Sequence, residues 1–183
     1  MLQFRIQSTP NPLARKYVLS QDLKREGKVS YQQANQCQHV PLANSLLQIE
    51  GVTQVHFFEN VLTITQDGSS DWSYMDHSVQ NIVNQEIEHH NIDFIDYIEE
   101  AKPDRKDLPP ELKAIEKILD ETIRPSLQMD GGDVEPLDLE GNILTIRYMG
   151  ACGGCPSSMT GTLEAIRHVL KAEFREDIEV VAI

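Results

Sequence analysis

Residues 129–158 read MDGGDVEPLDLEGNILTIRYMGACGGCPSS, and this stretch decides the fold of the C-terminal half of the chain. It contains two strand-like runs, 134–139 and 143–148, separated by Glu140-Gly141-Asn142, a sequence typical of a hairpin turn. The two glycines at 131–132 predict a preceding turn with positive φ, which glycine adopts without steric cost. The segment therefore predicts an antiparallel hairpin between a glycine turn and a C-x-x-C motif.

Periodic apolar residues predict one helix on each side of this hairpin. The first helix follows Pro109-Pro110, and the second begins at Pro156, because the missing N–H of a proline would be unpaired at the start of a helix anyway. The apolar positions are Leu112, Ile115, Ile118, Leu119, Ile123 and Leu127 in the first helix, and Met159, Leu163, Ile166, Val169, Leu170 and Phe174 in the second. With a final strand over 178–183, the predicted order of elements is α-β-β-α-β.

The first half of the chain predicts a second, separate arrangement of strands and helices. Residues on both sides of Glu59-Asn60 alternate between apolar and polar with period two, which indicates a hairpin. The expected strands are 4–6, 17–19, 52–57 and 61–65, and the expected helices are 41–49 and 72–90. The predicted fold class is α+β, with two small domains, each an antiparallel or mixed sheet with helices on one face.

Residues 99–110 separate the two halves. This stretch is charged, poor in apolar residues and interrupted by three prolines, so it is not expected to continue a helix or to join a core. We therefore predict an N-terminal domain over 1–98 that makes partner contacts, a short stiff linker over 99–107, and a C-terminal domain over 108–183 that contains the C-x-x-C motif.

The chain is strongly acidic, with 16 Lys and Arg against 29 Asp and Glu and a net charge of −13 over 183 residues. This charge argues against nucleic-acid binding, in which cations neutralise phosphates, and against docking on an anionic membrane. No apolar run approaches the roughly 18 residues that span a bilayer, and the N-terminus resembles neither a secretory signal nor a transit peptide. The sequence predicts a soluble protein of the bacterial cytoplasm and leaves a mature mitochondrial form open.

The chain contains three cysteines, Cys37, Cys152 and Cys155, and the last two form the C-x-x-C motif. An odd, sparse count is not a disulfide framework, so the pair is expected to be redox-active or metal-binding. The start of a helix favours the thiolate form, which is the form that binds metal or attacks a disulfide. Gly153-Gly154 between the cysteines lets both sulfurs converge and lets the thiols of another molecule approach.

A zinc site or an iron–sulfur cluster takes four protein donors, and one chain offers two. Cys37 is interpreted as a small apolar residue, and His168 lies about 20 Å along the predicted helix from Cys155. His89-His90 is interpreted as a solvated helix end. A metal centre in this protein therefore requires the C-x-x-C motifs of two chains. The residues alone leave three possibilities open, namely a shared cluster, a thiol–disulfide oxidoreductase and a zinc-bridged structural dimer.

Two longer motifs resemble a known family. The run IRPSLQMDGGDV at 123–134, followed by GACGGCPSS at 150–158 and Thr162-Leu163, closely resembles the NFU domain, the C-terminal domain of NifU-like proteins. The resemblance covers about residues 108–183. The first half resembles the N-terminal domain of mitochondrial-type NFU proteins, although residues 24–39 carry no family signature. The motifs that carry this second resemblance are Thr9-Pro10-Asn11-Pro12, Pro41-Leu42-Ala43, Ile49-Glu50-Gly51-Val52 with Val55, and Asp71-Trp72.

The resemblance implies an iron–sulfur cluster scaffold or carrier that is not an enzyme. It implies a homodimer that holds a [4Fe–4S] cluster between its subunits, receives it from upstream cluster donors and delivers it to apo-protein clients. Cys152 and Cys155 match the ligand positions of the family. Because the first half lacks the cysteines of a NifU-type scaffold domain, carriage is favoured over assembly of new clusters. Asp130 and Asp133, on either side of two glycines, are interpreted as residues that stabilise a turn rather than as catalytic acids.

Overall fold

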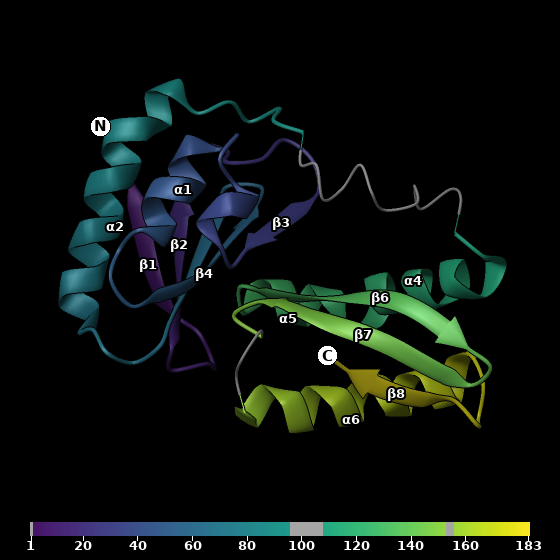
Figure 1. Ribbon diagram of the computed structural model, residues 1–183. Coiled ribbons are helices and arrows are strands. Elements are labelled where there is room, and N and C mark those ends of the chain that lie inside the picture. The colour runs from purple at the N-terminus through teal and green to yellow at the C-terminus, as the bar shows by residue number, and fades with distance from the viewer. Residues whose placement is uncertain (1, 96–107, 153–155) are drawn as a thin grey trace. The chain divides into compact units, whose positions relative to one another are not determined.

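The structure, a computed structural model, describes residues 2–95, 108–152 and 156–183, apart from the side chains of residues 156–160. The chain divides into two compact units, residues 1–96 and 97–183, and each has its own apolar core (Figure 1). Both units combine helices with a sheet, so the predicted α+β class is confirmed. The predicted linker at 99–107 lies outside the described residues, and the domain boundaries stay a prediction.

The N-terminal unit is a five-stranded antiparallel sheet in the order β1-β2-β5-β4-β3. Its strands are β1 (Phe4–Ser8), β2 (Ala14–Leu19), β3 (Lys28–Tyr31), β4 (Val52–Phe58) and β5 (Val61–Gln66). Its helices are α1 (Pro41–Leu47) and α2 (Trp72–Glu86), with single 3₁₀ turns η1 (Ala34–Gln36) and η2 (Ile87–His89). Side chains from α1 and α2 share one core with the sheet, as predicted for helices on one face.

The predicted hairpin of this unit is confirmed. The turn between β4 and β5 is Glu59-Asn60, and Glu59 has a φ of 49°. Strand β3 was not predicted; it lies at the edge of the sheet and is held there by pairing with β4. Helix α2 begins at Trp72, where the Asp71 side chain accepts a hydrogen bond of 2.7 Å from the Ser73 N–H.

The interpretation of His89-His90 as a solvated helix end is confirmed for His89, which is exposed, and is wrong for His90. The His90 Nε2 atom lies 2.7 Å from the backbone oxygen of Leu23, and the imidazole ring packs at 5.8 Å from the rings of both Phe57 and Phe94. This burial lowers the pKa of His90, although the hydrogen bond to Leu23 and the charge of Glu86 partly oppose the shift. The folded protein therefore favours the neutral imidazole.

The stability of the N-terminal unit is expected to fall as the pH falls below about 6.5, the ordinary pKa of histidine. Because the pKa of His90 is lowered in the folded state, the unfolded chain binds more protons at this pH, and stability rises with pH. Trp72, the single tryptophan, reports unfolding of this unit by fluorescence. Between pH 7.5 and 5.5 the thermal midpoint should fall less in His90→Gln than in the wild type. The exposed His77→Gln should keep the wild-type slope, and equal slopes for all three proteins would contradict the assignment.

The C-terminal unit has the predicted order of elements with one helix more. Its strands are β6 (Gly132–Glu140), β7 (Ile143–Gly150) and β8 (Glu179–Ala182), and its helices are α4 (Pro110–Thr122), α5 (Arg124–Met129) and α6 (Pro156–Glu173). The sheet order is β6-β7-β8, with β6 antiparallel and β8 parallel to β7, so this is the mixed sheet.

The single helix predicted over residues 112–127 is wrong, because the chain breaks at Ile123 between α4 and α5. Pro125 has no N–H to donate, and its ring would clash with the carbonyl of residue 121 in a continuous helix. Arg124, the first residue after the break, is buried, with only 2% of it exposed. A charged residue thereby enters the interior of the unit.

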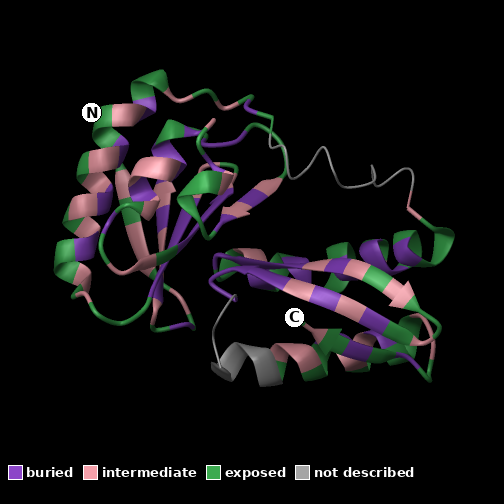
Figure 2. Ribbon diagram, in the orientation of Figure 1, coloured by how far each residue is buried: buried purple, intermediate pink, exposed green. Residues whose placement is uncertain are grey.

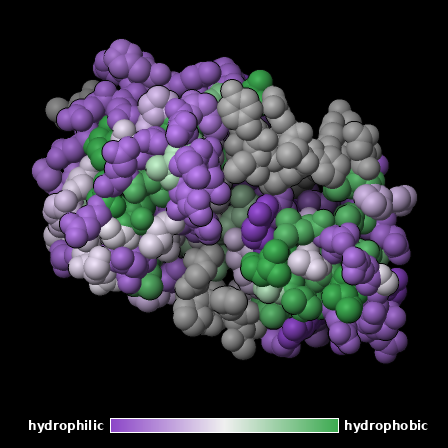
Figure 3. Space-filling model, in the orientation of Figure 1, coloured by the Kyte–Doolittle hydropathy of each residue, from purple (hydrophilic) through white to green (hydrophobic). Residues whose placement is uncertain are grey.

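Burial alternates along much of β6 and β7, and Figure 2 shows the resulting banding. Val134, Leu144 and Ile146 are fully buried with side chains from α4 and α6. Apolar side chains also gather on the surface over these strands in Figure 3, and the exposed apolar residues of the unit include Ile143, Val181 and Ile183. None of the described helices is both long and apolar enough to cross a membrane.

Candidate metal centre

Cys152 lies two residues beyond the end of β7, directly beside the start of β6. The antiparallel register pairs Gly150 of β7 with Gly132 of β6. Gly150 has a φ of 60°, which turns the chain, and the following Ala151 N–H donates a 3.0 Å hydrogen bond to the Gly131 carbonyl. Cys152, the first residue of the C-x-x-C motif, is thus adjacent in space to the DGGD motif, which lies some twenty residues earlier in the sequence.

Gly132 leaves the space that the Cys152 side chain occupies. A Cβ atom on Gly132 would lie 2.2 Å from Cys152 Sγ, 3.1 Å from Cys152 Cβ and 3.0 Å from its backbone nitrogen. Side-chain carbons essentially never come within 3.0 Å of a heavy atom, so no residue larger than glycine fits here without moving Cys152. We call the space beside Gly132 that the Cys152 side chain occupies the seat of Cys152. Gly131, the residue before Gly132, has a φ of 76° and makes the predicted positive-φ turn.

Cys152 is more enclosed than the sequence suggests. Only 4% of the residue is exposed, and it belongs to the apolar core with Leu127, Val134 and Tyr148. Burial, followed by the charge of Cys152, raises the pKa of Tyr148 to about 12. The Tyr148 hydroxyl is buried and has no hydrogen-bond partner among the described residues.

Cys155, together with Gly153 and Gly154, lies outside the described residues, so its predicted position near Cys152 stays a prediction. Helix α6 begins at Pro156, as the sequence predicts. Cys155 is therefore the residue immediately before the helix in the chain. The side chains of the first turn, residues 156–160, are also outside the described part.

The remaining candidate ligands lie elsewhere. Cys37 is completely buried in the core of the N-terminal unit, and its Sγ is 3.6 Å from the Ala34 carbonyl oxygen, which agrees with its interpretation as a small apolar residue. His168 is exposed on α6. Within residues 2–95, 108–152 and 156–183, no three His, Cys, Asp or Glu side chains are grouped so that they could hold a metal ion.

Sequence reasoning missed Gly132 and Arg124 and underestimated Asp133. Asp133 does more than stabilise a turn, because it is fully buried and its Oδ1 lies 3.4 Å from Arg124 Nε. The doubled glycine was the available signal for Gly132, since the turn itself uses positive φ only at Gly131. Arg124 carried no local signal, because a charged residue in a helix pattern is ordinarily exposed.

Both units of this fold match models of known protein families. Residues 4–90 match the model described as "Scaffold protein Nfu/NifU N terminal", and residues 115–181 match the model described as "NifU-like domain". These two matches cover most of the chain. The chain therefore belongs to the NFU family of NifU-like proteins.

Relatives with curated names match the chain along 90% of its length. The chain is 29% identical over 175 residues to the NFU1 iron-sulfur cluster scaffold homolog, mitochondrial, of Drosophila virilis, and 30% identical over 169 residues to NifU-like protein 4, mitochondrial, of Arabidopsis thaliana. It spans only 56% and 60% of the lengths of these two proteins. Among solved structures, a NifU-like protein from Saccharomyces cerevisiae is 20% identical with a TM-score of 0.47, covering 53% of this chain and 87% of that one.

Proposed function

We propose that this protein carries an iron–sulfur cluster as its cargo and delivers it to apo-protein clients. The cargo is a [4Fe–4S] cluster shared between two chains, each of which supplies the thiolates of Cys152 and Cys155. The observation that carries the proposal is that Cys152 packs against Gly132 of the DGGD motif. This contact lies in a unit that matches the NifU-like domain. The names of the relatives, which include iron–sulfur cluster scaffolds, support it.

The donor set suits a carrier better than a permanent centre. Thiolate is the ligand that iron–sulfur clusters require, and two per chain make four only in a homodimer. Transfer is then an exchange of ligands, in which client thiolates replace those of Cys152 and Cys155 while the cluster keeps its electrons. Such a protein is a carrier rather than an enzyme. The N-terminal unit would contribute contacts with clients or with upstream cluster donors, and the cytoplasmic location stays a prediction.

The burial of Cys152 weighs against a thiol–disulfide oxidoreductase. A cysteine that exchanges disulfides with other proteins is partly exposed in an electropositive environment. Cys152 is 4% exposed and lies in an apolar core, which differs from such an environment. A zinc-bridged dimer would use the same four thiolates and is separated from the cluster carrier by the test below.

Anaerobic reconstitution with iron and sulfide tests the proposal. The wild type is expected to bind about two iron and two sulfide ions per chain, the content of one [4Fe–4S] cluster shared by two chains. Its mass in solution should double on loading. The Cys152→Ala, Cys155→Ala double variant should remain a colourless monomer, whereas Cys37→Ala, which removes the third thiol from the other unit, should load like the wild type.

Three outcomes would overturn the proposal. The first is a wild type that takes up no iron, and the second is full loading of the double variant. The third is a protein that, purified without oxygen, contains zinc in place of iron and acid-labile sulfide, which would favour the structural dimer. Insulin reduction above the rate of buffer thiols would instead support the oxidoreductase.

A further inference from the structure

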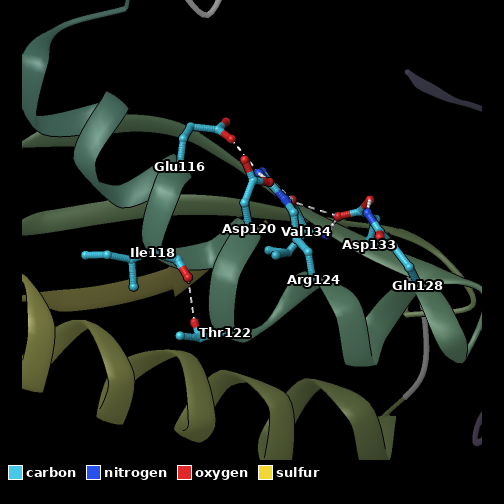
Figure 4. A network of polar contacts seen from close by, with 8 residues as sticks. All are labelled: Glu116, Ile118, Asp120, Thr122, Arg124, Gln128, Asp133 and Val134. Atoms are coloured by element: carbon cyan, nitrogen blue, oxygen red, sulfur yellow. Dashed lines mark hydrogen bonds and ion pairs between the residues drawn. The ribbon is translucent and has the colours of Figure 1, made fainter. Parts of the chain in front are cut away.

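A buried polar network joins α4, α5 and the start of β6, and Arg124 is its centre (Figure 4). The guanidinium donates through Nε and Nη2 to the Val134 carbonyl oxygen, at 3.1 and 3.0 Å. Its Nη1 donates to Glu116 Oε2 at 2.5 Å and also to Asp120 Oδ1. One side chain of α5 thereby holds both the preceding helix and the following strand.

Asp133 is the other half of this network. Its Oδ1 accepts a 2.6 Å hydrogen bond from the Val134 N–H and lies 3.4 Å from Arg124 Nε, and its Oδ2 accepts a 3.0 Å bond from Gln128 Nε2. The residue has no exposed surface. Both carboxylate oxygens of Asp133 are therefore engaged. Gln128 binds the Asp133 side chain and Arg124 binds the Val134 carbonyl oxygen, so both residues of β6 are fixed to α5.

The charges in this network are unusual for an interior. One guanidinium, 3% exposed in its side chain, faces the carboxylates of Glu116, Asp120 and Asp133. Burial by itself lowers the pKa of Arg124, but the hydrogen bond and charge of Glu116, followed by Asp120 and Asp133, more than offset this effect and raise the pKa above its ordinary value. Buried ion pairs of this kind contribute little net stability compared with apolar packing, so their use points to a requirement for position.

The network ends at the seat of Cys152. Asp133 directly follows Gly132, whose missing Cβ leaves the space for the Cys152 sulfur. A shift of β6 at Asp133 would therefore move Gly132 against or away from that sulfur. The bonds from Arg124 to Val134 and from Gln128 to Asp133 oppose such a shift.

We infer that the Arg124 network is a positioning device for Cys152, in which Arg124, Asp133 and Glu116 act on the cluster ligand through the backbone of Gly132. The inference rests on the proposed function and adds residues that touch no cargo to the cluster site. Loss of the network leaves both thiols in the protein but lets Cys152 leave its seat. Groups that orient metal ligands lower metal affinity about 10–100-fold when they are mutated, and we expect an effect of this size here.

Asp133→Asn is the main test, because it preserves the shape of the side chain while it removes the charge and one acceptor oxygen. After reconstitution, this variant should lose its cluster to an iron chelator at least about tenfold faster than the wild type, with an altered EPR spectrum of the reduced cluster. Glu135→Gln is the matched control, since it makes the same chemical change two residues further along β6, where the carboxylate pairs with Arg147 at 2.8 Å instead. Glu135→Gln should release its cluster at the wild-type rate and give the wild-type EPR spectrum.

The apo-protein provides a readout that does not depend on the cluster. In a background of Cys37→Ala and Cys155→Ala, Cys152 is the only thiol, and its burial predicts slow alkylation. Asp133→Asn should speed this reaction about tenfold, by an increase in the fraction of molecules in which Cys152 has left its seat. If the wild type binds no cluster but this acceleration is seen, the proposed function fails and the positioning role stands.

A folded Asp133→Asn variant with wild-type alkylation and cluster release would overturn the inference. Circular dichroism establishes whether the variant is folded. If it is not, Glu116→Gln replaces it, because this change weakens the network at its far end on α4 and leaves β6 untouched. Glu116→Gln should then release its cluster faster and be alkylated at Cys152 faster than the wild type, with smaller increases than those expected for Asp133→Asn. Wild-type rates of both reactions would reject the positioning role.

Discussion

Gly132→Ala is expected to weaken cluster binding strongly while the protein still folds. The added Cβ would lie 2.2 Å from Cys152 Sγ, so the sulfur must leave its position. A displaced ligand should weaken cluster retention about 10–100-fold, and overpacking should lower the free energy of unfolding of the C-terminal unit by about 1–3 kcal/mol. Iron and sulfide content after gel filtration, together with the rate of transfer to a chelator, measures the first effect.

Gly161→Ala is the matched control for this variant. Gly161 lies in α6, and a Cβ there would meet no described atom within 4 Å. Because alanine has the higher helix propensity, this change should stabilise the helix by up to about 1 kcal/mol and leave cluster binding unchanged. Wild-type cluster content and release in Gly132→Ala would show that Cys152 does not bind the cluster from its seat.

Phe57→Ala should destabilise the N-terminal unit by about 3–5 kcal/mol and leave the cluster site intact. Phe57 is fully buried in β4 and packs against the rings of His90 and Phe94, at 5.8 and 6.4 Å. Its removal therefore leaves a large cavity in a core that contains residues of this unit alone. Denaturant unfolding followed by Trp72 fluorescence measures the loss, and cluster content measures the function of the other unit.

The exposed Tyr74→Ala serves as control, since truncation of an aromatic side chain on the surface of α2 should change stability by less than about 0.5 kcal/mol. Phe57→Ala should load iron and sulfide to the wild-type level at temperatures at which its N-terminal unit is unfolded. If cluster binding is lost in parallel with the Trp72 signal, the two units do not act independently, and the proposed division of labour between them is wrong.

Much of the fold followed from local pattern. Both hairpins were predicted because their turns, Glu59-Asn60 and Glu140-Gly141-Asn142, separate alternating segments, and the structure confirms both. The start of α6 followed from Pro156. The same local reasoning failed at Pro125, where the apolar spacing of a helix continued through a proline that breaks it. It also missed β3, which depends on a partner strand from elsewhere in the chain.

The candidate site was likewise predicted only in part. Cys152 and Cys155 were predicted as ligands from their spacing, their place before a helix and the family resemblance, and their role as cluster ligands stays a prediction. The seat at Gly132 was not predicted, because nothing in the sequence indicates that one glycine of the pair packs against a cysteine twenty residues later. The role of Asp133 was read as local, although its partners Arg124 and Gln128 come from another element.

The sequence by itself determined the order of elements in the C-terminal unit apart from the break between α4 and α5, together with its family and the count of two thiols that predicts a second chain. These properties depend on residues close together in the chain, where periodicity, turn chemistry and motif spacing act directly. Only the tertiary structure decided that Arg124 lies inside, that Asp133 faces it and that Cys152 packs on Gly132. Each of these depends on a contact between separate elements, and the free energy that places a charge in the interior comes from partners that only the folded chain assembles.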